Sequence, residues 1–358
     1  MTEGPTGDWQ LISTVRNPWG KVPITGGDPR AGAARARLDE LMAQAHQPDP
    51  PSRRHHYVPK SYMKYWSEDG KRIRILDTVT GSRRHVGLRD TCVAEDFYRV
   101  VGVDGKPHNR VELMYSVLDR ELARIQRLLV GLSDPETLTF DDFMSIGLLV
   151  SVQRGRTPQM RRWLAAQAEW HRSQGFGGSD DPALSQIELA GSHTESAFNT
   201  IYTAADVMTS RQLEIWTDSK GRFITSDAPV QASQLAERRP NLLEAHRIWW
   251  PISPTRAVCL VNEITGNKAE MRTANTRQVE EVRTAMVRGR ERVIIGRQQQ
   301  LDGLPQSPIR KRVQLRMRCT PRGQGCLVES AETYAAGPDI QLCDNGLHQE
   351  APGVAQFA

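Results

Sequence analysis

The strongest constraint on the fold is a helical periodicity between Asn109 and Leu132. Its apolar residues recur every three or four positions, at Val111, Met114, Leu118, Leu122, Ile125 and Leu129. That spacing places them on one face of a helix, which must be buried against other elements. Asp134-Pro135 ends the pattern, because proline lacks the backbone donor that a continuing helix needs.

Further helices are predicted on both sides of this one. A second long helix covers 141–172, with Phe143, Ile146 and Val150 on one face, and a third helical region covers 184–210. Shorter helices are expected at 33–45, 61–66 and 276–288.

Strands are predicted where apolar residues alternate around turns. The segments 72–77 and 83–88 flank Thr80-Gly81 and predict one hairpin. The segments 212–217 and 222–227 predict a second hairpin, with 218–221 as its loop. Apolar runs at 257–261 and 292–296 predict two more strands. The order of these elements predicts an α+β fold, a mainly antiparallel sheet built from hairpins and packed against three long helices.

Composition divides the chain into three parts. We predict that residues 1–50 form a flexible extension that includes the amphipathic piece at 33–45. We predict that residues 51–300 form the α+β core domain. Residues 301–358 predict a polar C-terminal extension, with irregular structure from Arg297 onwards. Both extensions are expected to be dispensable for the core fold.

Charge and hydropathy limit the partners. The net charge is +5 and arginine far outnumbers lysine, which permits binding to nucleic acid or a nucleotide. No run reaches the roughly 18 apolar residues of a transmembrane helix, so no membrane partner is expected. The N-terminus lacks a signal-peptide pattern, which predicts a cytoplasmic location.

Two histidines and one aspartate are the candidate catalytic residues. His55 and His56 lie between a basic pair and Tyr57-Val58-Pro59, and imidazole exchanges protons near neutral pH. Asp227 follows the apolar pair Phe223-Ile224 at a strand end, where loops often carry function. The alternative is structural: a histidine that caps a turn, and an aspartate that binds nearby backbone N–H groups.

The candidate substrate-binding residues are Gln153, Arg154, Arg156, Thr225 and Ser226. Arg154 continues the apolar face of the second long helix, and a buried guanidinium needs an anion. That anion is either a bound phosphate or a carboxylate such as Asp227, in which case the arginine forms a structural ion pair.

The cysteines give a weaker signal for a metal. Cys319, Cys326, Cys343 and His348 cluster near the C-terminus and are the metal-site candidates. Their spacing lacks the close Cys-x2-Cys pairs typical of zinc sites. No Walker loop, dinucleotide fingerprint, His-Glu-x-x-His or Gly-x-Ser-x-Gly motif occurs, which excludes the readily recognised ATPases, dehydrogenases, zincins and α/β-hydrolases.

Three sequence blocks together resemble one family. They are His55-His56-Tyr57-Val58-Pro59, Arg156-Thr157-Pro158 and Thr225-Ser226-Asp227-x-Pro229-Val230. Their order and spacing resemble the bacterial domain-of-unknown-function family 4238, over about residues 53–296. The resemblance implies no activity.

Two functions are compatible with these residues. The first is a phosphodiester hydrolase of the nuclease type, in which arginine binds phosphate and the histidines and Asp227 move protons or share a divalent metal. The second is a non-catalytic module that binds a ligand or a protein, with the same cluster fixing the fold. Both require the double-histidine stretch, Asp227 and Arg154 or Arg156 to meet in space.

Overall fold

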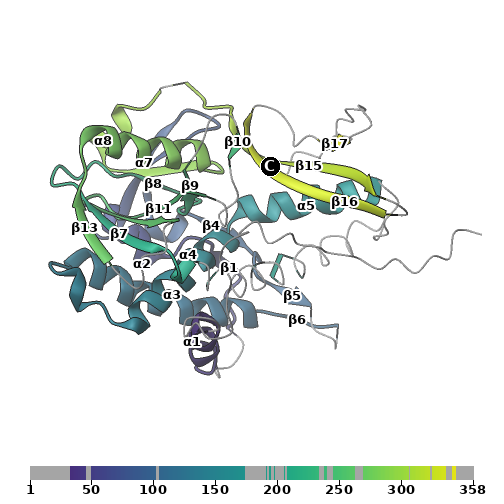
Figure 1. Cartoon of the computed structure of the whole chain (residues 1–358), viewed down its shortest axis with the longest axis horizontal. Coiled ribbons are helices and arrows are strands. Elements are labelled where there is room, and N and C mark those ends of the chain that lie inside the picture. The colour runs from purple at the N-terminus through teal and green to yellow at the C-terminus, as the bar shows by residue number, and fades with distance from the viewer. Residues whose placement is uncertain are drawn as a thin grey trace, which may run out of the picture.

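The computed structural model describes residues 33–45, 50–101, 105–173, 191, 193–194, 197, 205, 208–233, 238–239, 245–262, 269–305, 307–322, 325–335 and 341–343. The fold is α+β, as predicted, with mostly antiparallel sheets and helices packed against them (Figure 1). No helix in these residues is long and apolar enough to cross a lipid bilayer.

A five-stranded sheet forms the centre of the molecule, in the order β13-β7-β12-β11-β9. Only the β13–β7 pair is parallel. The strands are β7 (Gln212–Thr217), β9 (Gln231–Ala232), β11 (Arg247–Ser253), β12 (Arg256–Val261) and β13 (Ala269–Thr273).

The two faces of this sheet build two separate hydrophobic cores. In β12, Val258 and Leu260 contribute to the core that includes α3 and α4, whereas Cys259 contributes to the core that includes α7. Successive side chains of a strand point to opposite faces, so helices on both sides can bury one sheet. Figure 1 shows α7 on one side of these strands and α3 on the other.

The periodicity between Asn109 and Leu132 does form a helix, α3 (Arg110–Gly131). The helix predicted at 276–288 is α7 (Thr276–Gly289), which Asn275 caps through a bond from the Gln278 N–H. The helix predicted at 61–66 is α2 (Lys60–Met63), followed by a 3-10 turn at Lys64–Trp66. Of the region 184–210, the described residues up to Thr209 are helical.

The single helix predicted over 141–172 is wrong in one respect, because it is two helices. They are α4 (Phe140–Gly155) and α5 (Pro158–Ser173). Proline is favoured at the first position of a helix, so Pro158 begins α5 instead of bending a continuous helix. Arg156 therefore lies in the junction between the two helices and not within a helix.

A second sheet holds the predicted hairpin 72–77/83–88 as β2 (Arg72–Asp77) and β3 (Arg83–Gly87). Its order is β3-β2-β14-β8, with β14 (Val293–Gly296) and β8 (Thr225–Ser226). The hairpin predicted from 212–217 and 222–227 is wrong. The first segment, β7, pairs with β12 and β13, and the second enters this other sheet through β8.

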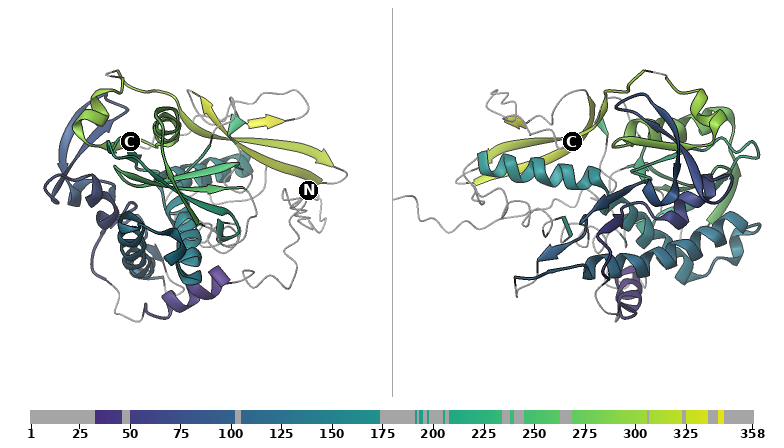
Figure 2. Two further views of the ribbon diagram at one scale, coloured as in Figure 1. Left: turned by 60° about the vertical axis from the view of Figure 1, so that its left-hand side comes forward. Right: turned by 180° about the vertical axis from the view of Figure 1, so that it is seen from behind.

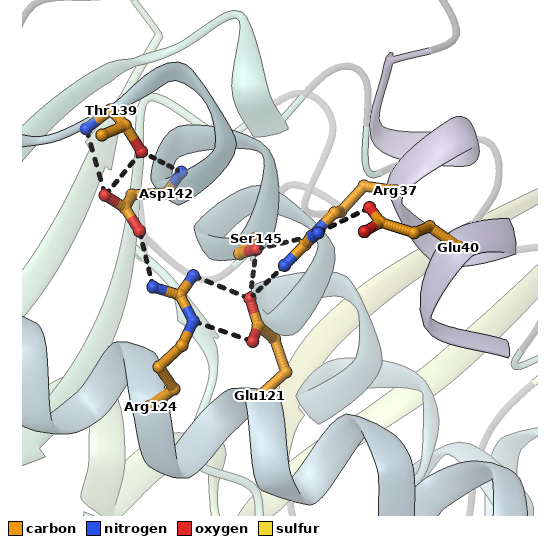
Figure 3. A network of polar contacts seen from close by, with 7 residues as sticks. All are labelled: Arg37, Glu40, Glu121, Arg124, Thr139, Asp142 and Ser145. Atoms are coloured by element: carbon orange, nitrogen blue, oxygen red, sulfur yellow. Dashed lines mark hydrogen bonds and ion pairs between the residues drawn. The ribbon is translucent and has the colours of Figure 1, made fainter. Parts of the chain in front are cut away.

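The N-terminal amphipathic piece is α1 (Ala33–Met42), and its Leu38 is fully buried in the first core. A polar network ties it to α3 and α4 (Figure 3). Arg37 binds Glu121 at 3.2 Å, and Glu121 accepts from Ser145 at 2.5 Å. Arg124 links Glu121 to Asp142 (2.8 and 2.9 Å). This part of the predicted extension packs against the core domain.

The irregular structure predicted from Arg297 onwards is also wrong. The chain forms α8 (Gln298–Asp302) and then a long antiparallel hairpin, β15 (Arg312–Arg322) and β16 (Gly325–Ala335). The flanking strands of this sheet are β10 (Arg238–Arg239) and β17 (Gln341–Cys343). Figures 1 and 2 show the hairpin extending from the body with α5 alongside. In β15, Val313, Leu315, Met317 and Cys319 alternate with polar residues, a strand signal that the sequence prediction missed.

Candidate active site

The double-histidine stretch is a short strand, β1 (Arg54–His56), paired with β4 (Val93–Glu95). His55 is fully buried and stacks on Tyr98. Its Nδ1 accepts the Tyr98 N–H at 2.9 Å, so its Nε2 donates to the Ser52 carbonyl at 2.9 Å. Burial lowers the pKa of His55, which keeps the ring neutral. Both ring nitrogens of His55 form hydrogen bonds to main-chain groups, which explains why this polar side chain can be buried.

Asp227 is 1% exposed and serves as an acceptor for main chain. Its oxygens accept the N–H groups of Glu291 (2.9 Å), Arg292 (2.7 Å) and Val293 (2.8 Å). Burial raises the pKa of Asp227 to about 7, although these three donors oppose the rise. The carboxylate thereby joins the end of β8 to the beginning of β14.

Thr225 and Ser226 have local partners. The Thr225 Oγ1 lies 2.8 Å from the Tyr62 hydroxyl, which also donates to the Pro251 carbonyl. The Ser226 Oγ accepts the Ala228 N–H at 3.2 Å and donates to the Ala228 carbonyl at 2.9 Å. Such a hydroxyl-stabilised turn gives Ser226 a local structural role.

Arg156 is fully buried, but its anion is not the predicted one. Its Nη1 binds Asp119 at 2.5 Å, and its Nη2 donates to the His56 carbonyl at 2.6 Å. The expected ion pair with Asp227 is therefore wrong, because α3 supplies the carboxylate. The negative charge of Asp227 acts instead near Tyr57. Burial raises the pKa of Tyr57, and neighbouring negative charges add to the rise. Arg156 contacts the double-histidine stretch through the His56 carbonyl, and Asp227 lies near the residue that follows it, Tyr57.

The other two residues predicted on this helix have different surroundings. Arg154 donates to the Gln159 Oε1 at 2.8 Å, and its guanidinium lies 4.9 Å from the centre of the Trp163 ring. Gln153 is 1% exposed, and its amide atoms have no hydrogen-bond partner among the described residues. A role for either in binding substrate stays a prediction.

A group of charged side chains around Arg156 reaches solvent. We call Lys60, Glu112, Asp119, Arg156 and His56 the Glu112 cluster. Lys60 is exposed and the Asp119 side chain is 27% exposed, whereas Arg156 is closed off beneath them. Four parts of the chain supply the cluster: β1, the first turn of α2, one face of α3, and the junction between α4 and α5, which holds Arg156.

Glu112 has the most perturbed carboxyl group in this cluster. Its Oε2 is buried and has no hydrogen-bond partner among the described residues. Burial raises the pKa of Glu112 to about 7, and the negative charge of Asp119 adds to the rise. The positive charges of Arg156 and Lys60 oppose it. A carboxyl group with a pKa near neutrality can donate or accept a proton at physiological pH.

His56 is the neutral member of the cluster. Burial, together with the positive charges of Lys60 and Arg156, lowers its pKa to about 4. Its Nε2 lies 3.4 Å from the Leu88 carbonyl, a longer and weaker contact than those of His55. Of the two adjacent histidines, His56 is therefore the one with fewer structural constraints.

The sequence prediction missed Glu112, Asp119 and Lys60. The signal was present in α3, where Glu112, Tyr115 and Asp119 follow one another at spacings of three and four residues. That spacing places two carboxylates and a phenol on one helix face. The guanidinium of Arg156 lies 4.7 Å from the centre of the Tyr115 ring, so Tyr115 forms one wall of the cluster.

Three of the four residues of the predicted metal site lie in the sheet of the C-terminal hairpin. His348 is outside the described residues. The backbone of Cys319 pairs with that of Cys343 across β15 and β17, and Cys326 lies opposite Pro321. Among the described residues, no group of three or more His, Cys, Asp or Glu side chains could hold a metal ion.

Comparison with known families agrees with the resemblance of the sequence blocks. Residues 54–300 match the family described as "Protein of unknown function (DUF4238)". The chain belongs to this family. Curated proteins gave no match, and neither did solved structures. In this DUF4238 protein, the first two blocks meet at the Glu112 cluster through Arg156 and the His56 carbonyl.

Proposed function

We propose that this DUF4238 protein is a phosphodiester hydrolase with the Glu112 cluster as its active site. The observation that carries the proposal is Glu112 itself, a carboxyl group with a pKa of about 7 beside an exposed lysine. Acids and bases poised near the working pH are concentrated at catalytic sites. Nucleic acid or a nucleotide is the proposed substrate, and the cytoplasm the proposed location.

The cluster has a charge arrangement suited to a phosphodiester. Asp119 neutralises Arg156, which leaves the positive charge of Lys60 to attract the phosphate. A bound phosphate raises the proton affinity of its neighbours by adding negative charge. Glu112 then holds a proton that it can donate to the leaving oxygen. His56, made more basic by the same charge, accepts a proton from the attacking water.

Variants of Glu112 test this mechanism directly. Hydrolysis of bis(p-nitrophenyl) phosphate and of labelled single-stranded DNA and RNA is measured for wild type and Glu112→Gln, with Mg²⁺, with Mn²⁺ and with EDTA. The glutamine cannot transfer a proton, so we expect a rate loss of about 100-fold or more. Glu136→Gln, at an exposed position, is the matched control and keeps wild-type activity. A fully active Glu112→Gln variant contradicts the proposal.

The second candidate, a non-catalytic binding module, is favoured by a separate observation. His55 and Asp227 direct all their described hydrogen bonds to main chain, as residues that fix a fold do. Wild-type protein that binds nucleic acid or a nucleotide but hydrolyses none of the substrates, under all three metal conditions, supports this candidate.

A further inference from the structure

Arg161, in the first turn of α5, is a partly buried cation with only neutral partners. Its Nη2 donates to the Phe97 carbonyl, and its Nε lies 3.4 Å from the Nδ1 of His193. Within the described part of the chain, no carboxylate forms an ion pair with it. The next residue, Arg162, shows the usual arrangement, with its Nε 2.8 Å from Glu291.

This environment is unfavourable for an unpaired cation. Taking a guanidinium out of water costs free energy unless an anion compensates it. Burial lowers the pKa of Arg161 to about 10, which reflects the same cost. The amino end of α5 adds positive partial charge at this position. Burial and the amino end of the helix therefore both favour an anion beside Arg161.

The neighbouring side chains hold the guanidinium in a fixed orientation. It lies 4.0 Å from the centre of the Phe97 ring, close enough for stacking. The Nε2 of His193 donates to the Gly155 carbonyl at 3.2 Å, which leaves its Nδ1 as an acceptor for Arg161. His193 is 1% exposed, and burial lowers its pKa to about 3, so the ring stays a neutral acceptor.

Near Arg161, the arginines among the described residues outnumber the carboxylates by one. Arg99 and Arg53 share Asp96, at 3.4 and 2.5 Å, and Arg53 also contacts Glu95 at 3.2 Å. Two carboxylates therefore serve two arginines, and Arg161 is the third cation. Arg161 and Arg99 both lower the pKa of His55, after burial, which places their positive charges near the same ring.

We propose that Arg161 binds a phosphate group, and that Phe97 and His193 orient its guanidinium for this contact. Two of the three guanidinium nitrogens are engaged with protein, and Nη1 has no protein acceptor among the described residues. An arginine held in one plane suits a phosphate, because the donor geometry is set before the anion arrives. This site is separate from the proton transfer assigned to Glu112 and does not depend on it.

Thermal unfolding with inorganic phosphate as the probe tests this proposal. Melting temperatures are measured at pH 7.5 in increasing sodium phosphate, with sodium chloride at matched ionic strength as the reference. A ligand that binds only the folded protein raises Tm with its concentration. We expect the phosphate-specific rise in wild type and in Arg127→Gln, at an exposed position of α3, and a smaller rise in Arg161→Gln, because phosphate can also bind at Lys60.

The remaining outcomes also decide the matter. A phosphate-specific rise in Arg161→Gln equal to that of wild type overturns the proposal, and so does the absence of a rise in wild type. Acetate that stabilises as well as phosphate overturns the choice of phosphate. If Arg161→Gln does not fold, Arg161→Lys replaces it with phosphate titrated by calorimetry. The lysine lacks the planar fork, so we expect weaker binding, and an unchanged Kd counts against the proposal.

Discussion

Two buried carboxyl groups make the stability of this protein depend on pH near neutrality. Burial raises the pKa of Asp227 from 3.8 to about 7 and that of Glu112 from 4.5 to about 7. Each group binds its proton more tightly in the folded than in the unfolded chain. Its contribution to stability is therefore present at low pH and declines as the pH rises from about 4 to about 7.

We expect the free energy of unfolding to fall between about pH 4 and pH 7, and less steeply in Asp227→Asn. Urea unfolding at several pH values gives the slope of the free energy of unfolding against pH. The slopes are compared, and not the absolute stabilities, because Asp227→Asn also removes a charged hydrogen-bond acceptor. Asp302→Asn, at an exposed position, is the control with a wild-type slope. Equal slopes in wild type and Asp227→Asn contradict a raised pKa at Asp227.

At the residue scale, the sequence predicted part of the convergence of its blocks but not the partners of their side chains. The double-histidine and Arg156 blocks do meet, through the His56 carbonyl. The anion of Arg156 was out of reach, because Asp119 reads as an ordinary polar residue on an amphipathic helix. Only the crossing of α3 with the end of α4 brings its carboxylate to 2.5 Å from the guanidinium. Which carboxylate lies opposite a buried arginine is decided by tertiary packing.

At the scale of elements, local patterns predicted what forms but not what it pairs with. The α3 periodicity and the β2–β3 hairpin are confirmed because their signals lie within a few residues of each other. The partner of β8 is β14, which lies far along the chain. Nothing in the alternation of 222–227 distinguishes that pairing from a hairpin with β7, since both bury the same apolar residues.

The helix α1 gives a prediction at this scale. Leu38 is fully buried between α1 and the core, whereas Glu40 on the same helix is exposed. We expect Leu38→Ala to lower the free energy of unfolding by about 2–4 kcal/mol, through lost burial and a cavity. Glu40→Ala, measured in the same urea titration, is expected to change it by less than about 1 kcal/mol, because its ion pair with Arg37 is near the surface.

This measurement also bears on the boundary of the core domain. Residues 1–50 were expected to be dispensable, but α1 contributes both an apolar face and Arg37 of the network in Figure 3. A Leu38→Ala variant as stable as wild type supports the original boundary near residue 51. A clear loss of stability moves the beginning of the folded unit to α1.

At the scale of the whole molecule, part of the positive charge is already used in internal ion pairs. The chain has 47 lysine and arginine residues against 42 acidic residues, for a net charge of +5. Many arginines already have carboxylate partners, among them Arg124 with Glu121, Arg162 with Glu291 and Arg292 with Asp77. A paired arginine can neutralise a phosphate only by giving up its own carboxylate.

Binding to nucleic acid should therefore be weak and moderately dependent on salt. The logarithm of the affinity falls with the logarithm of the salt concentration in proportion to the number of phosphates neutralised. Because the net charge is only +5, we expect about three or four phosphates to be involved, and a slope of about −3. Fluorescence anisotropy of a labelled single-stranded oligonucleotide, titrated at several sodium chloride concentrations, measures this slope. Affinity independent of salt excludes the basic surface as the binding element, and a slope near −10 means that the internal ion pairs open on binding.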